Sequence, residues 1–363
     1  MSKSHRKRRR RNGRVTSNPT AATTLLRQNY QKYGSVGIVN LAAHFAGQAS
    51  NGDDEEPRDG PRRILRGKAF VQLMAKERSK LGAGALAAAA EVWPEPEVRD
   101  LARDLLAQRR NQLSGMLRDL GETTVVGTWR LTNEYRDVSV LLFELAVVGR
   151  HLATLAVTTE ENSRWIEVLL LNPPAVEAAE QFDLTTDQPG GPRRIFQQLE
   201  REDARFEAWI LSGRRQREGE PAAGVVLGWV ARLLDVDVEF PAIPSFNRTH
   251  DVDGELDFED ALHDFLWSEV GGRWGDECFD ELVDHLRSFE SSAQSLRWSP
   301  ARVEYFLLFQ MHGLEDGHAY ALPALLRGWV AHCATVTRQR KPLLRAVRAE
   351  IDRCEPEFFV NAA

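Results

Sequence analysis

The stretch that decides the fold is residues 138–159, VSVLLFELAVVGRHLATLAVTT. Two runs rich in β-branched and apolar residues stand on either side of Gly149 and Arg150, a pattern typical of two strands joined by a tight turn. The run from Val140 to Val148 is almost entirely apolar, which predicts a strand covered on both faces. We therefore expect an antiparallel hairpin inside a sheet.

Similar segments continue on both sides of this hairpin. Residues 123–132 and 165–171 are also rich in β-branched and aromatic residues, and turn-forming residues 160–163 precede the last segment. This spacing is typical of an antiparallel meander of three or four strands.

Helical periodicity surrounds the meander. In residues 64–120, Leu65, Phe70 and Met74 begin an apolar stripe, and the small residues of 81–90 suit close helix packing. Ser299 followed by Pro300 is a helix start signal, with the serine as N-cap. Further helices are predicted at 194–211, 222–234, 259–270, 277–288, 300–311, 323–337 and 342–354. The predicted fold class is α+β, predominantly helical with a small central antiparallel β-meander.

The predicted domain organisation has four parts. Residues 1–24 are basic, polar and aperiodic, which predicts a disordered basic tail. Residues 25–62 contain a short apolar segment and then a flexible acidic linker rich in Gly, Asn, Asp, Glu and Pro. Residues 63–215 are expected to form helices and the antiparallel meander, and residues 216–363 a C-terminal helical part.

Length and cysteine content narrow the class of protein. A chain of 363 residues suits one large or two ordinary domains. Three scattered cysteines, Cys278, Cys333 and Cys354, fit a reducing cytosol better than a disulfide framework. They lie among apolar residues of predicted helices, where thiols are inert. No stretch approaches the roughly 18 apolar residues that span a bilayer, so we expect a cytoplasmic protein without a transmembrane segment.

Charge is distributed unevenly along the chain. The whole chain has 47 Lys and Arg against 53 Asp and Glu. The first fourteen residues hold eight basic side chains and no acidic one. The basic residues are Lys3, Arg6, Lys7, Arg8, Arg9, Arg10, Arg11 and Arg14. The remainder, with 39 basic against 53 acidic side chains, carries about −14, and such a body repels polyanions.

This tail is the first candidate functional site. Flexible Arg and Lys side chains pair with phosphates and release condensed counterions, which gives affinity without sequence preference. The tail therefore predicts contact with nucleic acid or another polyanion. A solubilising terminus without a specific partner is the alternative interpretation.

The second candidate is residues 249–260, THDVDGELDFED, which resemble an EF-hand calcium loop. Asp251, Asp253, Asp257 and Asp260 fall at loop positions 3, 5, 9 and 12, and they are the candidate ligands for Ca²⁺ or another divalent metal.

This loop departs from the EF-hand pattern. Position 1 is Thr249, and position 12 is an aspartate where the pattern has a bidentate glutamate. Pro241 and Pro244 stand where the incoming helix belongs. The alternative is an acidic turn that leads into a helix, where carboxylates complement the helix dipole.

Catalytic motifs are lacking: there is no GxSxG elbow, HExxH, Walker loop or Rossmann fingerprint. The acids between Asp276 and His285 lie opposite apolar Leu282 and Leu286, which predicts a solvated helix face. Trp267 is among the tryptophans expected on apolar helix faces. We therefore expect a non-enzymatic binding protein. The alternatives are a divalent-metal-dependent enzyme or calcium-responsive protein that uses the loop 249–260, and a protein-interaction module whose protein partner is unknown.

Parts of the chain resemble a group of uncharacterised actinobacterial proteins. The matching parts are the meander 138–171 with residues 175–182, and the segments WSPARVEYFL (298–307) and LPALLRGWV (322–330). In that group an antiparallel segment carries a His, then an Asp-His and a glycine pair. His151 matches the first His, but AVTT stands at residues 156–159 in place of the Asp-His. The resemblance implies a helix–meander–helix layout in a cytoplasmic actinobacterial protein, and no activity.

Overall fold

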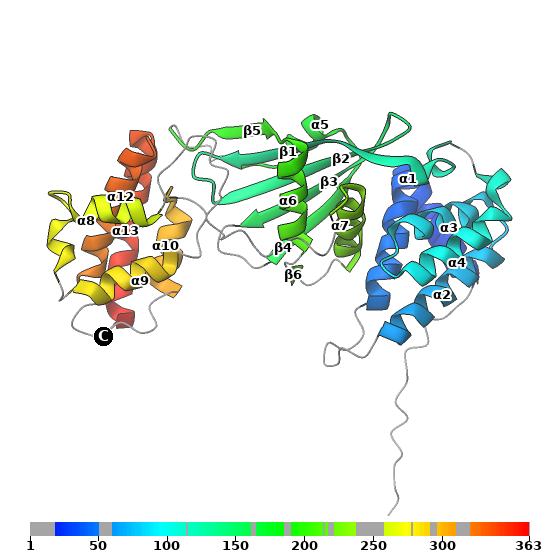
Figure 1. The fold of residues 1–363 in the computed structure, drawn as a ribbon, viewed down its shortest axis with the longest axis horizontal. Helices are drawn as coiled ribbons and strands as arrows, with labels where there is room; N and C mark the ends of the chain where they lie inside the picture. The colour runs from blue at the N-terminus through cyan, green and yellow to red at the C-terminus, as the bar shows by residue number, and fades with distance from the viewer. Residues whose placement is uncertain are drawn as a thin grey trace, which may run out of the picture. The chain divides into compact units, whose positions relative to one another are not determined.

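The computed structural model describes residues 19–50, 60–113, 115–160, 165–184, 190–212, 215–216, 221–236, 258–276, 279–290, 296–309 and 320–362. Its fold is α+β and predominantly helical, with a sheet formed by the middle of the chain (Figure 1), which confirms the predicted fold class.

The α-helices are α1 (Pro19–Ser50), α2 (Gly60–Lys76), α3 (Lys80–Val92), α4 (Pro96–Ala107), α5 (Ala175–Ala179), α6 (Arg201–Ser212), α7 (Pro221–Leu233), α8 (Phe258–Leu266), α9 (Asp280–Glu290), α10 (Pro300–Phe309), α12 (Leu322–Val336) and α13 (Lys341–Ala362). The short 3₁₀ helices are η1 (Arg110–Gln112), η2 (Gly115–Leu117), η3 (Leu120–Glu122) and η4 (Gly272–Gly275). The strands are β1 (Thr123–Asn133), β2 (Val138–Val147), β3 (Arg150–Glu160), β4 (Trp165–Leu171), β5 (Arg194–Gln198) and β6 (Arg215–Gln216).

The chain divides into two compact units, each discontinuous in sequence. Unit 1 consists of Met1–Thr124, Leu145–Ala153 and Glu218–Leu233. Unit 2 consists of Val125–Glu144, Thr154–Arg217 and Leu234–Ala363. This division does not follow the predicted boundary at residue 216, because α7 packs against α1 and α3 in unit 1.

The central element of unit 1 is α3, which is buried along almost its whole length. Ser79 begins this helix as its N-cap, since its Oγ accepts a hydrogen bond from Gly82 N–H at 3.2 Å. Because its residues are mostly Ala and Gly, α1, α2 and α4 pack closely around it. At Gly84 a Cβ atom would lie 2.8 Å from Leu117 Cδ1. The prediction of close packing for residues 81–90 is confirmed.

Helix α1 is longer than the short apolar segment predicted within residues 25–62. It continues through residues 47–50, which the Gly- and Asn-rich composition had assigned to a linker. Its kink lies at Gly34, whose φ of 63° falls in the left-handed region. Beyond the kink the helix buries Ile38, Val39 and Ala42 and packs on α3 and α7, so tertiary burial outweighs the weak helix propensity.

The predicted meander is confirmed as β1 to β4, within a sheet of strand order β5-β1-β2-β3-β4-β6. β2 is buried along most of its length, as its apolar run predicted. Between β2 and β3, Val148 and Gly149 have φ values of 50° and 71°. Two consecutive left-handed residues are the geometry of a type I′ hairpin turn, whose twist matches that of the strands.

The prediction of one helix over residues 194–211 is wrong in its first part. Residues 194–198 form β5, which pairs antiparallel with β1 so that Phe196 lies opposite Leu131. The Phe196 ring also stacks on Trp129, with ring centroids 6.5 Å apart. Pairing with the edge of β1 therefore overrides the helical periodicity. The helix α6 starts only at Arg201 and lies across the sheet (Figure 1), where Glu207 forms an ion pair with Arg130 of β1.

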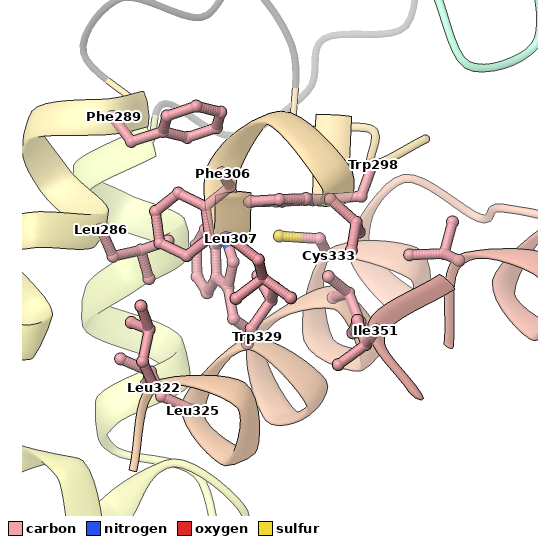
Figure 2. Close-up of a cluster of buried hydrophobic side chains, with 14 of the residues drawn as sticks. Leu286, Phe289, Trp298, Phe306, Leu307, Leu322, Leu325, Trp329, Cys333 and Ile351 are labelled. Carbon is pink, nitrogen blue, oxygen red and sulfur yellow. The ribbon is translucent and has the colours of Figure 1, made fainter. Parts of the chain in front are cut away.

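The last helices of unit 2 enclose an aromatic cluster (Figure 2). Trp298, Phe306 and Trp329 are fully buried there, and the sulfur of Cys333 lies among them. Ser299 Oγ accepts a hydrogen bond from the backbone N–H of Arg302 at 3.1 Å, which confirms the predicted N-cap of α10.

The turn between β1 and β2 reaches this cluster through Tyr135. Asn133 Oδ1 accepts hydrogen bonds from the backbone N–H groups of Tyr135 and Arg136, at 3.0 and 2.9 Å, and so shapes the turn. The Tyr135 side chain is buried with the cluster, and its hydroxyl lies 3.5 Å from the carbonyl oxygen of Leu343 in α13. The β1–β2 turn thus contributes a side chain to the core of the C-terminal helices, whereas Leu131, Val140 and Leu142 of the sheet belong to a separate cluster.

Candidate functional site

The two sites predicted from the sequence lie mostly outside the described residues. The basic residues 3–14 are not described, and neither are Asp251, Asp253 and Asp257. Asp260 is described and is exposed in the first turn of α8, which begins at Phe258, so the helix predicted after the acidic loop is present. The described residues contain no group of three or more His, Cys, Asp or Glu that could hold a metal ion. Metal binding by the loop stays a prediction.

Helix α1, like the basic tail before it, contains no Asp or Glu. The first acidic residue of the chain is Asp53, so residues 1–52 hold ten Lys and Arg and no Asp or Glu. Residues 53–59 then hold five acidic residues and one arginine. Helix α2 follows with five more basic residues and again no acid.

We call the exposed members of this set the α1–α2 cations. They are Arg27 and Lys32 in α1 and Arg62, Arg63, Arg66 and Lys76 in α2. Helices α1 and α2 pack against each other, so these cations belong to one pair of helices. Leu65, expected in the core, lies between Arg63 and Arg66 and is 66% exposed. The apolar stripe of α2 is therefore formed by Phe70, Val71 and Met74.

The two units carry opposite net charges. Unit 1 has 25 Lys and Arg against 15 Asp and Glu, a net charge of +10. Unit 2 has 22 against 38, a net charge of −16. Without residues 1–14, unit 1 still has 17 basic against 15 acidic side chains. The acidic charge that is expected to repel polyanions therefore belongs to unit 2, and unit 1 without the tail is close to neutral.

Two arginines of unit 1, Arg66 and Arg109, bind the ends of helices. Arg66 Nη1 donates to the carbonyl oxygen of Ala49 at 3.4 Å, near the end of α1. Arg109 donates to the carbonyl oxygens of Met74 and Ala75 at 3.1 and 3.3 Å, at the end of α2, and to that of Ser79 at 2.9 Å. Cations are favourable at these ends because the helix dipole is negative there.

Three more arginines meet at the end of α3. Arg103 donates to the carbonyl oxygen of Ala90 at 3.1 Å, and Arg232 to that of Glu91 at 2.8 Å. Arg99 donates to the carbonyl oxygen of Trp93 at 2.8 Å.

The electrostatics of this cluster are internal to unit 1. Burial raises the pKa of Glu91 against the attraction of the three guanidinium groups. Burial and the like charge of Arg99 lower the pKa of Arg232 to about 10. The arginines at the end of α3 are therefore part of the helix packing, whereas the α1–α2 cations are exposed, including Arg66, which also donates to Ala49.

The exposed part of α1 before the kink also carries two tyrosines that the sequence analysis did not single out. Tyr30 and Tyr33 are 43% and 39% exposed. Lys32 Nζ lies 4.7 Å from the centroid of the Tyr33 ring. Arg27 stands three residues before Tyr30, on a neighbouring part of the helix surface. The signal in the sequence was the combination of two tyrosines three residues apart with a segment free of acids.

Trp267 and the cysteines of unit 2 were both expected to be buried on apolar helix faces. Trp267 is not on an apolar helix face: it follows the end of α8 at Leu266 and is 81% exposed. Cys333 and Cys354 are buried, as predicted for inert core cysteines, and burial raises the pKa of the Cys354 thiol to about 11. Cys278 lies outside the described residues.

Comparison with known proteins gives no family assignment. No protein-family model, no curated protein and no solved structure matches the chain. Within the described ranges, every helix is too short or too polar to cross a membrane.

Proposed function

We propose that this protein binds nucleic acid through its basic N-terminal arm, residues 3–14, assisted by the α1–α2 cations. The observation that carries the proposal is the run of 52 residues with ten cations and no carboxylate, which leads from the arm into α1. Phosphate groups are the natural partners of such a run, because each contact releases a condensed counterion.

The anchoring of α1 supports this proposal. Leu26 and Ile38 are buried in unit 1, so the helix that follows the arm is fixed by packing. An extended arm of twelve residues reaches about 40–43 Å, over which a duplex presents one charge about every 1.7 Å. An arm attached to a fixed helix can therefore contact many phosphates while unit 1 stays in place.

The charges of the two units favour one orientation. Unit 2, with a net charge of −16, repels phosphate groups, whereas unit 1 attracts them through the arm. We therefore expect the ligand to lie on unit 1.

The test is a salt series with labelled nucleic acid. The full-length protein and residues 15–363 are titrated against duplex DNA and against RNA. With about six to eight phosphate contacts, log K against log salt has a slope of about −5 to −7 for the full-length protein on duplex DNA. The truncated protein should lose most of this slope. Equal, negligible binding by both proteins would contradict the proposal.

Two sets of variants separate charge from other effects. Replacing Arg8, Arg9, Arg10 and Arg11 by lysine keeps the charge and should keep most of the affinity, whereas glutamine at these positions should remove it. The matched control is glutamine at Arg345 and Arg348, two exposed cations of α13 in unit 2, which should leave binding unchanged.

A further inference from the structure

We infer that the ligand is single-stranded nucleic acid, whose unpaired bases stack on Tyr30 and Tyr33 of α1. The inference rests on the proposed function, because the arm and the α1–α2 cations supply the attraction for phosphates. It adds the class of ligand and the residues that select it.

The placement of the two tyrosines carries this inference. They are three residues apart on one helix, so their Cβ atoms are about 5–6 Å from each other. Neighbouring unpaired bases of one strand can reach both rings. Within the described part of the chain neither ring pairs with another aromatic side chain, and both are more than one third exposed. Apolar ring surface is thus left in contact with solvent on the helix that follows the basic arm in the sequence.

The groups around the rings suit a nucleic acid strand. Arg27 and Lys32 are exposed on the same part of α1 and provide contacts for phosphates. Gln28 and Gln31 are also exposed, and their amides both donate and accept hydrogen bonds. No carboxylate belongs to this part of the chain to repel the backbone. The helix surface therefore offers cations for the phosphates of a strand and hydrogen-bonding amides and rings for its bases.

Stacking distinguishes single strands from duplexes. In a duplex the faces of the bases are covered by their neighbours, so a tyrosine ring on a helix surface meets only the backbone. In a single strand the faces are open, and aromatic side chains with nearby cations are the usual platform for them. The ammonium group of Lys32 lies over the Tyr33 ring, 4.7 Å from its centroid, so a cation that can pair with phosphate already stands at this ring.

The experiment compares three ligands by fluorescence anisotropy: a labelled oligouridine, a blunt DNA duplex, and heparin, which has charge but no bases. The full-length protein is compared with its Tyr30→Ala/Tyr33→Ala variant. We expect this variant to bind oligouridine about tenfold or more weakly and heparin equally well, since stacking contributes only where bases are present. Tyr30→Phe/Tyr33→Phe keeps the rings and should keep the affinity. Tyr320→Ala, which removes an exposed tyrosine of unit 2, is the matched control and should change nothing.

The results can contradict either the base stacking alone or the proposed function as a whole. If the alanine variant binds oligouridine as tightly as the natural chain, while deletion of the arm abolishes binding to all three ligands, base stacking is wrong and the proposed function stands. If the full-length protein binds none of the ligands, the proposed function itself fails. Tighter binding of the duplex than of oligouridine would also overturn the inference.

A second measurement avoids dependence on the folding of the variants. An oligomer that contains 5-iodouridine is irradiated with the natural full-length chain, and the cross-linked peptide is identified by mass spectrometry. A cross-link to Tyr30 or Tyr33 supports stacking. Cross-links found only on other segments contradict it. A parallel titration with oligodeoxyuridine, which differs from oligouridine only in the sugar, then shows whether the 2′-hydroxyl adds to the affinity.

Discussion

Glu134 and Arg340, 206 residues apart in the chain, form an ion pair in unit 2 that is held by three hydrogen bonds. Arg340 Nε donates to Glu134 Oε1 at 2.8 Å, and its Nη2 donates to Oε2 and to the carbonyl oxygen of Gly191, the latter at 2.6 Å. The backbone N–H of Arg193 also donates to Glu134 Oε2 at 2.6 Å. One carboxylate thus joins the β1–β2 turn, the segment before β5 and the start of α13.

This ion pair predicts that the free energy of unfolding falls when the pH becomes acidic. Partial burial alone would raise the pKa of Glu134, but the hydrogen bonds from Arg340 and Arg193 outweigh it and lower the pKa. The folded protein therefore holds the charged form more strongly than the unfolded chain does. The stabilisation is present above the ordinary carboxyl pKa of about 4.3 and is lost as the pH falls through the lower pKa of the folded state.

Glu134→Gln should accordingly lower the melting temperature most near neutral pH. The difference from the natural chain should shrink in acid. Thermal melts across a pH series measure it, with Glu357→Gln on the exposed side of α13 as the control. A difference that is independent of pH would show that the ion pair is not its source.

Arg109 is expected to be the more important of two adjacent arginines in unit 1. Its guanidinium group donates hydrogen bonds to carbonyl oxygens at the end of α2 and just before α3, whereas Arg110 is exposed. Arg109→Ala should destabilise unit 1 by about 1–3 kcal/mol, because charged hydrogen bonds to partly buried carbonyl groups are lost. Arg110→Ala should change stability by less than about 0.5 kcal/mol. Urea unfolding of both variants measures the difference, and equal effects would refute a specific role for Arg109.

Two partly buried histidines are expected to make unit 2 less stable in mild acid. The Nε2 atoms of His285 and His332 are buried without a hydrogen-bond partner in the described residues. Burial lowers the pKa of both rings. The negative charge of Glu281 opposes this effect at His285. At His332 a hydrogen bond with the backbone of Ala261 and the charge of Asp264 oppose it. The unfolded chain therefore binds protons more readily than the folded one. Stability should be full above about pH 6.5 and should fall as the pH drops below it.

Phenylalanine at position 285 should reduce this dependence. Its ring can keep the contact with Phe306, whose centroid lies 5.4 Å from that of His285. Chemical denaturation at neutral and at mildly acidic pH gives the comparison. If His285→Phe loses as much stability in acid as the natural chain does, His285 does not contribute to the pH dependence.

The buried thiols of unit 2 should be unreactive in the folded protein. Cys333 and Cys354 are both buried, and a thiol with a pKa of about 11, as for Cys354, is almost entirely protonated at neutral pH. Alkylation by iodoacetamide, followed by mass spectrometry of the peptides, should label both residues only after denaturant is added. Rapid labelling of either one in the native protein would contradict the core position.

The sequence predicted those parts of the fold whose local pattern agrees with their tertiary surroundings. The meander followed from the apolar run of β2 and the turn after it, and the start of α10 followed from Ser299 and Pro300. Local pattern failed where long-range pairing decided the outcome. Residues 194–198 read as helix, but they pair with β1 as β5. The small residues of α1 read as a linker in part, but they are buried against α3 and α7.

The positive charge of the candidate site could be predicted from the sequence, but the side chains that it exposes could not. The sequence showed the basic arm, but the exposure of Tyr30, Tyr33 and Leu65 depends on which side of each helix is buried. Nor could the sequence separate the arginines that bind helix ends from those that face solvent, because Arg109 and Arg110 are chemically identical. The opposite charges of the two units emerged only when the helices before β1 were assigned to a unit apart from most of the sheet, because residues 1–124 alone carry 23 basic against 13 acidic side chains.

The insertion of Tyr135 among the last helices has a consequence for how the protein is made. During synthesis Tyr135 emerges long before Leu343, its partner in α13, so the β1–β2 turn has no core to enter until the C-terminal helices have been translated. In the same way α1 is synthesised well before α7, which covers it. Contacts between such distant parts of a chain slow folding. A nascent chain of this protein therefore exposes apolar surface for most of its translation, and growing chains that stop before α13 are the forms that we expect to need chaperones.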